Sequence, residues 1–292
     1  MRPSIFVTCL LAFTLTGERS SAAIIAHDTF SDGGRSNGAD PLDLAWYKSL
    51  STMQVAVAND PFIGSGNALH VDVVDVNIPR VLGTFPLVAV GPNTGDKIRA
   101  SFDLRLNDPI PQPVQSGDGN NLRFGLYNSN GNAVASDEWS ESGHTGYRSS
   151  ITTGYDPGGF GRINRDVGTD MGGGSNTLLS TTKVGTMPDL TDSTLTHSIF
   201  IEIERLTLNS LQITMGVDGF LTASAADSGP SLVEAFDEIV IRGGTAAALP
   251  VDFTLDNVLV ESISAVPEPS TSALATIGML ALVLYGWRRR SR

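Results

Sequence analysis

Short runs of alternating apolar and polar residues, separated by turn residues, constrain this chain more than any other feature of its sequence. Residues 68–76 and 97–106 alternate with a period of two, as half-buried strands do. Similar β-rich runs occur at 24–30, 122–127, 197–205, 211–217, 220–223, 238–242 and 251–260. No stretch between Ile24 and Ser264 keeps a helical period for three turns, so this part of the chain is expected to be all-β.

Turn residues separate these runs, and their types favour antiparallel pairing of the strands. Asn128-Ser129-Asn130-Gly131 and Asp218-Gly219 each follow a strand-like run directly. Many short strands with polar outer faces, and no strand–helix alternation, predict an antiparallel two-sheet sandwich. The glycine-rich segment from Thr153 to Asn176 breaks the pattern and is expected to form one long loop.

The N-terminal residues have the three parts of a secretory signal peptide, and we predict one over residues 1–23. Arg2 precedes the apolar stretch from Ile5 to Leu15, and small side chains lead up to a cleavage point after Ala23. The stretch is shorter than the roughly 20 apolar residues that span a bilayer as a helix. The single cysteine of the chain, Cys9, would leave with this peptide, so disulfide and thiolate chemistry are not expected in the mature protein.

The C-terminal segment, residues 265–292, has a different three-part pattern. The motif Val266-Pro267-Glu268-Pro269 precedes a stretch without charge, and the basic cluster Arg288-Arg289-Arg290 follows it. We predict a transmembrane helix at about residues 270–287, which would be about 27 Å long and close to the thickness of a bilayer core. By the positive-inside rule the arginines would stop on the cytoplasmic side, leaving the rest of the chain outside.

Together these parts resemble the PEP-CTERM sorting signal of Gram-negative bacteria. The resemblance implies recognition by an exosortase, a membrane-embedded processing enzyme, while the helix holds the chain in the inner membrane. It further implies cleavage near Pro267-Glu268-Pro269 and delivery to the cell surface or extracellular matrix. Proteins with this signal usually accompany exopolysaccharide production, so exopolysaccharide is the expected partner.

Removing both predicted end segments makes the remaining body more acidic. Six of the 19 basic and two of the 31 acidic residues lie in these ends, which leaves the body with a net charge of −16. A surface this acidic repels the phosphates of nucleic acids and anionic membrane surfaces. Nucleic acid is therefore not an expected partner.

The body, residues 24–264, resembles the concanavalin-like, or laminin-G-like, jelly roll. The resemblance rests on Asp28-Thr29-Phe30-Ser31-Asp32 with Trp46 downstream, on the hairpin Ile213–Gly219, and on the closing run Leu255-Asp256-Asn257-Val258. In that fold the first and last strands pair. Jelly-roll binding modules often hold calcium between the early loop and the closing strand, which implies a structural Ca²⁺ site involving Asp32 and Asp256; no other cofactor is expected.

Jelly rolls of this type include glycan hydrolases, so paired carboxylates need examination. Retaining glycosidases use two carboxyl groups about 5–5.5 Å apart, and residues two apart on one strand come near this distance. Glu202 and Glu204 have that spacing. The third acidic residue of the hydrolase pattern is missing, because Leu206 and Thr207 follow. We therefore interpret the pair as the solvated face of a strand and expect no enzymatic activity; a glycan-active hydrolase is the alternative.

Aromatic side chains near the glycine-rich segment are candidates for stacking on sugar rings. They are Trp139, Tyr147, Tyr155 and Phe160. The alternative is that these side chains pin the loop to the sandwich. The sequence thus predicts an exported surface or matrix protein without enzymatic activity that binds exopolysaccharide.

Overall fold

The structure is a computed structural model of the 292-residue chain. It describes residues 21–36, 38, 40–64, 66–73, 80–107, 121–139, 142–152, 161–168, 171, 176–180, 190, 192–243, 252–265, 278–279 and 287–288. Ala22–Ala265 forms a compact unit of its own, which is called the body below.

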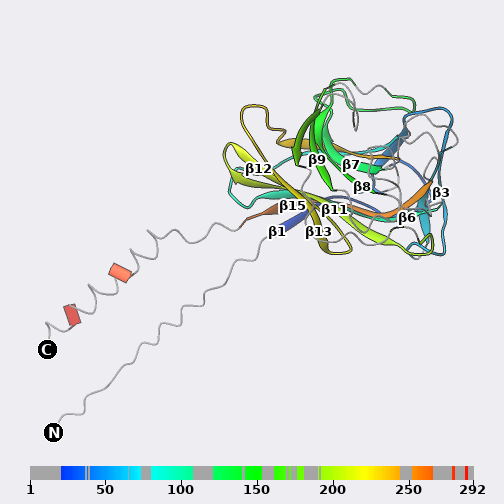
Figure 1. The fold of residues 1–292 in the computed structure, drawn as a ribbon. Helices are drawn as coiled ribbons and strands as arrows, with labels where there is room; N and C mark the ends of the chain where they lie inside the picture. Colours follow the sequence, from blue (N-terminus) through cyan, green and yellow to red (C-terminus); the bar gives the residue numbers. More distant parts are fainter. Residues whose placement is uncertain are drawn as a thin grey trace, which may run out of the picture. The chain divides into compact units, whose positions relative to one another are not determined.

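The body is built from two β-sheets (Figure 1). Sheet A has the order β13 (Phe220–Ser228), β12 (Ser210–Val217), β11 (His197–Thr207), β6 (Lys97–Leu106), β15 (Phe253–Ser264), β4 (Asn67–Val73) and β3 (Met53–Asn59), and β1 (Ser21–Asp28) also pairs with β15. Sheet B has the order β10 (Asn176–Ser180), β9 (Arg162–Val167), β8 (Thr145–Thr152), β7 (Asn121–Asn128), β14 (Ala235–Arg242), β5 (Arg80–Ala89) and β2 (Ala45–Lys48).

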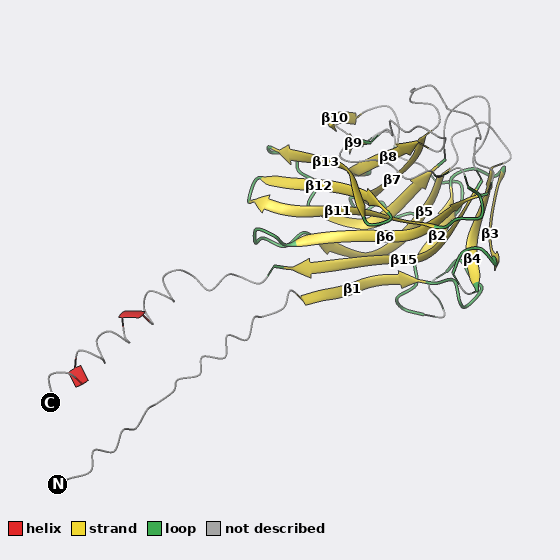
Figure 2. Ribbon diagram, turned by 60° about the horizontal axis from the view of Figure 1, so that its bottom comes forward, coloured by secondary structure: helices red, strands yellow, loops and turns green. Residues whose placement is uncertain are grey.

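The predicted all-β, antiparallel two-sheet jelly-roll sandwich is confirmed. Figure 2 shows β13, β12, β11, β6, β15 and β1 side by side in one layer, with sheet B behind it. The sheets are not meanders, because β6 lies between β11 and β15, and β14 lies between β7 and β5. Strands far apart in the sequence therefore become neighbours, as the expected pairing of the first strand with the last one illustrates.

The two sheets enclose one apolar core. On β11, Ile199, Ile201 and Ile203 are fully buried, while the residues between them are partly exposed. Phe102 of sheet A meets Phe124 of sheet B edge to face, with ring centroids 5.5 Å apart. Burying an aliphatic side chain of this size contributes about 1.5–3 kcal/mol, so the inward rows of the two sheets dominate the stability of the sandwich.

The predicted turn at Asp218-Gly219 joins β12 to β13. Both residues have positive φ angles, 52° and 79°, which is the conformation that a two-residue hairpin loop needs to match the twist of its strands. The Asp218 carboxylate also accepts a hydrogen bond from the backbone N–H of Ser198. Local turn chemistry and the neighbouring strand thus support the same hairpin.

The expectation of a single loop from Thr153 to Asn176 is wrong in part. Strand β9 lies inside this segment and pairs with β8 and β10. The side of β9 that faces the core lacks the apolar alternation that identified the other strands, because the next core-facing residue after Ile163 is Arg165. Arg165 instead forms an ion pair with the buried Asp227 of β13, at 2.9 Å.

The predicted end segments fall largely outside the described residues. The signal peptide through residue 20, the motif Val266–Pro269, and Arg289 and Arg290 are not described. Residues 278–279 and 287–288 are helical, and Trp287 is exposed. Among the described residues, no helix has the length and apolar character needed to cross a membrane.

The buried carboxylate of Asp28 ties the end of β1 to β2. Its two oxygens accept hydrogen bonds from the Phe30 backbone N–H at 2.8 Å and from Trp46 Nε1 at 2.9 Å. Burial raises the pKa of Asp28, and the two donors oppose that rise. This geometry explains why an Asp-Thr-Phe opening with a downstream tryptophan indicates this fold.

Asp43, in the connection between β1 and β2, lies close to several other carboxylates. Burial, followed by repulsion from Asp28, Asp40 and Asp32, raises its pKa from 3.8 to about 6. The folded state thus holds a proton on Asp43 at pH values where the unfolded chain has already released it.

We expect Asp28→Ala to lower the free energy of unfolding by about 2 kcal/mol, because it leaves the Trp46 indole N–H and the Phe30 N–H without an acceptor. Urea unfolding followed by tryptophan fluorescence measures the change. Asp32→Ala is the matched control, since Asp32 is exposed and accepts a hydrogen bond from the Gly34 N–H within its own turn, at 2.8 Å. Equal losses in both variants would contradict a special role for Asp28.

We expect Asp43→Asn to stabilise the protein at pH 7 by about 1 kcal/mol, the solvent-screened part of the effect of the pKa shift. For a carboxyl group with a raised folded pKa, stability falls as the pH rises from 3.8 to about 6 and is constant above that. The advantage of the variant should therefore vanish near pH 4. Unfolding curves between pH 4 and 8 measure it, with the exposed Asp72→Asn on β4 as control.

Candidate functional site

The outer face of sheet B, turned away from sheet A, carries an unusual set of polar side chains. Arg123 lies between the core residues Leu122 and Phe124, so strand alternation directs it outward. The same argument places Arg242, next to the core residue Ile241, on this face.

Four arginines are aligned across this face in strand register. Arg80 of β5 is opposite Arg242 of β14, and Arg242 is opposite Arg123 of β7. Arg123 is opposite Ser150 of β8, which is opposite Arg162 of β9. We call Arg80, Arg242, Arg123 and Arg162 the arginine row. Arg80 and Arg242 are buried, whereas Arg123 and Arg162 are partly exposed.

A fifth arginine on the same face belongs to a hydrogen-bonded network. Arg148 of β8 donates from Nε to Asp166 Oδ1 of β9 at 3.0 Å. The hydroxyl of Tyr127, on β7, donates to the other oxygen of Asp166 at 2.6 Å. All three side chains are buried, so they form a hydrogen-bonded polar network beside the arginine row.

His144, directly before β8, and Glu238, on β14, form a buried histidine–carboxylate pair on sheet B. His144 Nδ1 and Glu238 Oε2 are 2.7 Å apart, and the two side chains are 2% and 0% exposed. The second oxygen, Glu238 Oε1, is buried without a hydrogen-bond partner, and so is Trp139 Nε1. Buried polar atoms without partners are rare, and they often mark a place where water or a ligand supplies the missing contact.

An apolar cluster covers part of this face. Leu82, Tyr127 and Val240 project from the sheet, and Val134 and Met171 pack onto them, with Tyr47 and Trp139 at the margin. Arg80 Nε donates to the Met171 carbonyl oxygen at 2.9 Å. The outer face of sheet B therefore combines arginines, a buried histidine–carboxylate pair and an aromatic margin.

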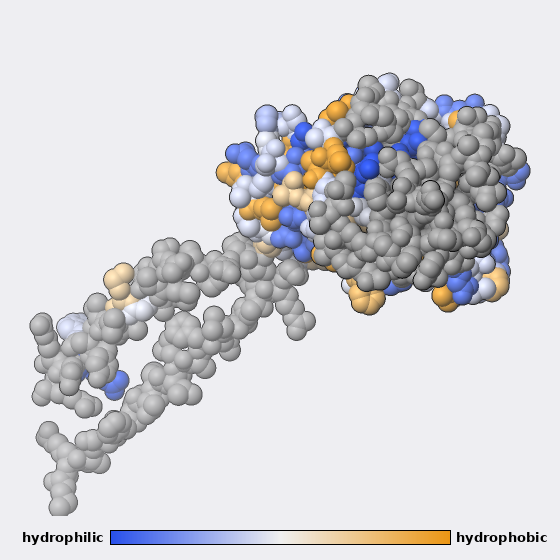
Figure 3. All heavy atoms as spheres, viewed as in Figure 1, coloured by the Kyte–Doolittle hydropathy of each residue, from blue (hydrophilic) through white to orange (hydrophobic). Residues whose placement is uncertain are grey.

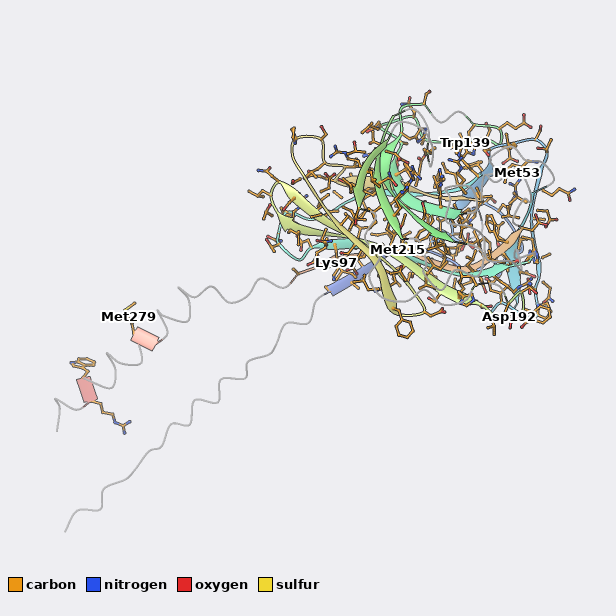
Figure 4. All side chains as sticks on the ribbon, in the orientation of Figure 1. Met53, Lys97, Trp139, Asp192, Met215 and Met279 are labelled. Carbon is orange, nitrogen blue, oxygen red and sulfur yellow. The ribbon has the colours of Figure 1, made fainter. Side chains whose placement is uncertain are left out.

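Glu202 and Glu204 lie on the outer face of sheet A, on β11. Lys97 of the neighbouring strand β6 contacts both, at 3.1 and 3.8 Å, and Arg99 lies 3.9 Å from Glu202. This cross-strand ion ladder agrees with the interpretation of the pair as a solvated strand face. Figure 4 shows Lys97 well separated from Trp139.

The four aromatic candidates are not all on one surface. Trp139 lies at the margin of the apolar cluster on sheet B, partly exposed. Tyr147 is fully buried in the main core, where its hydroxyl donates to Asp227 at 2.8 Å, so it offers no face to a sugar ring. Burial and this hydrogen bond raise the pKa of Tyr147. Tyr155 and Phe160 lie outside the described residues.

Asp256 lines a polar cavity of about 600 Å³ beside the closing strand. The other lining residues are Thr29, Ser31, Gly64, Gly66, Asn67 and Asn257. Burial raises the pKa of Asp256, and Asp103, directly opposite on β6, adds to the rise. Asp32 is not part of this lining. Among the described residues no group of three or more acidic, histidine or cysteine side chains could hold a metal ion, and the calcium site at Asp32 and Asp256 stays a prediction.

A smaller cavity, of about 270 Å³, lies at the edge of sheet B beside β2. Its lining includes Arg35 and Asp137, which form an ion pair at 3.2 Å. The pair neutralises both charges, so this cavity presents no net charge to a ligand. Exposed apolar residues form small separate areas on the coloured part of the face in Figure 3, and the described surface there shows no broad apolar patch.

Inspection of single sequence runs did not identify the arginine row. Each arginine alternates with core residues, as in Leu122-Arg123-Phe124, which is a local signal for an outward position. The arginines come from four strands spread over the sequence from Arg80 to Arg242. Only the pairing register brings them into one row.

Comparisons with known proteins identify a motif in the tail and find solved structures that resemble the body at low identity. Residues 265–290 match the PEP-CTERM protein-sorting motif. No curated protein matches the chain. Similar solved structures include a carbohydrate esterase from the Shiga toxin-encoding bacteriophage phi24B, with 14% identity, a TM-score of 0.47, and coverage of 84% of this chain and 100% of that one.

Two further structures have similar values. A protein of unknown function with a galectin-like fold from Bacillus subtilis is 12% identical, with a TM-score of 0.46, and the match covers 85% of this chain and 100% of that one. An endo-1,3-beta-glucanase from Streptomyces sioyaensis is 16% identical, with a TM-score of 0.44 and coverages of 85% and 98%. The chain thus carries a PEP-CTERM sorting motif, which implies export, membrane association, processing by an exosortase and a place on the cell surface.

Proposed function

We propose that this chain is an exosortase-sorted surface protein that binds exopolysaccharide on the outer face of sheet B and catalyses no reaction. The observation that carries the proposal is the layer of buried polar side chains on a sheet face outside the core. Among them, Trp139 Nε1 belongs to a partly exposed side chain and has no hydrogen-bond partner. A donor of this kind matches the hydroxyl groups of a sugar, which accept hydrogen bonds.

The partly exposed Trp139 adds a flat apolar surface at the margin of this layer. Ligand sites combine aromatic surface with a few fixed polar groups that set orientation. The two oxygens of Asp166 accept hydrogen bonds from Tyr127 and Arg148, so these groups keep their positions without a ligand. A face organised in this way loses little conformational entropy on binding.

Two observations support the absence of catalysis. Glu202 and Glu204 both contact Lys97, so each carboxylate already has a cationic partner on the neighbouring strand. His144 and Glu238 are almost fully buried, at 2% and 0% exposure, so neither reaches a substrate at the surface. The competing function is a glycan hydrolase that uses Glu202 and Glu204.

We expect the protein to bind glycans on an array and to release no reducing sugar from them. Trp139→Ala should weaken binding about three- to tenfold through the loss of stacking. Phe220→Ala is the matched control, because Phe220 is an exposed aromatic residue on β13 of sheet A. Turnover in the native protein that disappears in Glu204→Gln would establish the hydrolase instead.

We expect replacement of Pro267, Glu268 and Pro269 by alanine to stop processing, because the match at residues 265–290 includes this motif. The variant should accumulate in the membrane fraction as the longer, unprocessed chain. Immunoblots of membrane, surface and medium fractions measure this, and alanine replacement of Ser262 on β15 is the control. Normal surface delivery of the triple variant would contradict exosortase sorting.

A further inference from the structure

The polar cavity beside the closing strand is a second candidate site, separate from the sheet B face. We infer that it binds one neutral sugar unit, whose hydroxyl groups contact Asp256 and the hydroxyl and amide groups around it. Its volume of about 600 Å³ lies within the range of small-molecule sites. The inference goes beyond the proposed function, because the described lining of the cavity shares no residue with the apolar cluster and aromatic margin of sheet B.

The cavity lies outside sheet A, where the first and last strands of the body meet. Asp256 follows the core residue Leu255 on β15, so strand alternation directs it away from the core. β15 pairs with β4 only as far as Leu255, and Figure 2 shows β1 alongside β15. Thr29 and Ser31 come directly after β1, and Asn67 begins β4. The lining therefore comes from segments that are far apart in the sequence.

Three residues at this cavity have a left-handed backbone conformation. Phe30, between the lining residues Thr29 and Ser31, has a φ angle of 52°, Asn257 one of 49° and Gly64 one of 61°. For a bulky residue such as phenylalanine this conformation is an outlier. The pairing of β15 with β6 also shifts its register directly after Asp256. Strained residues and β-bulges are concentrated at ligand sites, so their coincidence here indicates a geometry maintained for binding.

The carboxylate of Asp256 is held in the cavity wall by its neighbours. The side chain is almost fully buried, with an exposed fraction of 4%, and Oδ1 accepts a hydrogen bond from the Asn257 backbone N–H at 2.7 Å. Oδ2 points towards Gly64, where a Cβ atom would overlap with it. Glycine at position 64 thus meets two requirements, since it allows the positive φ angle and leaves room for the carboxylate.

The groups in the described lining suit the hydroxyl groups of a neutral sugar. A carboxylate accepts several hydrogen bonds, and the side chains of Thr29, Ser31 and Asn67 can both donate and accept, as sugar hydroxyls do. Gly66 adds backbone without a side chain, which allows a ring to approach closely. The ionisable side chain in this lining is Asp256, so an acidic sugar would meet a like charge that a neutral sugar avoids.

Saturation-transfer NMR titrations test this inference on the full chain, in a detergent without sugar headgroups. The ligands are glucose, galactose and mannose, together with the uronic acid that matches each. We expect a neutral sugar to bind and its uronic acid to bind about tenfold more weakly or less. Asp256→Asn should weaken the neutral sugar about tenfold and reduce its advantage over the uronic acid, because the charged acceptor is lost. Asp72→Asn, an exposed change on β4, is the matched control and should alter neither.

A steric variant, Gly66→Leu, keeps the test valid if Asp256→Asn does not fold. A Cβ atom at Gly66 would meet no protein atom within 4 Å, so the leucine side chain can occupy the open space that Gly66 lines. Sugar binding should be lost, while the thermal unfolding temperature should stay close to that of the native protein. Unchanged sugar affinity in both variants, or equal affinity for neutral and acidic sugars, would overturn the inference.

Two further measurements separate this site from the alternatives. Trp139→Ala should leave the binding of the single sugars unchanged. Loss in Trp139→Ala alone would assign the sugar to the sheet B face and overturn only this inference, whereas array binding lost in Asp256→Asn alone would overturn the sheet B proposal. Thermal stabilisation by CaCl₂ that Asp256→Asn abolishes, with no binding of any neutral sugar, would assign the cavity to a structural cation and overturn the inference.

Discussion

The packing of two apolar sheet faces against each other is the constraint on which the rest of this molecule depends. Phe102 and Phe124 meet edge to face across the layer between the sheets, and the inward isoleucines of β11 are fully buried beside them. Every inward position that goes to the core directs its sequence neighbours outward. The outer faces, where the charged residues lie, are therefore a direct consequence of core formation.

Charged residues are arranged differently on the outer faces of the two sheets. On sheet A, Lys97 contacts Glu202 and Glu204, so opposite charges alternate across neighbouring strands. On sheet B, Arg80, Arg242 and Arg123 are direct cross-strand neighbours. Sheet A thus places opposite charges on neighbouring strands, whereas sheet B places arginines opposite one another.

The local patterns predicted the fold class and many of its parts. Alternation identified β6 and β11, and Asp218-Gly219 indicated a tight turn, because these signals arise from contacts within a few residues. Strand β9 was missed, since its inward Arg165 is held by Asp227, a residue 62 positions away. A buried ion pair between distant residues leaves no apolar periodicity for a sequence pattern to detect.

The sequence by itself contained the PEP-CTERM motif at residues 265–290, which implies export and sorting, because this motif is a linear signal read in order along the chain. It also determined the β-sandwich class, since strand alternation is a local property. The tertiary structure alone decided that four arginines from Arg80 to Arg242 form one row, and that Tyr147 is enclosed in the core. Cross-strand register depends on the simultaneous packing of both sheets, and no single run of the sequence contains that information.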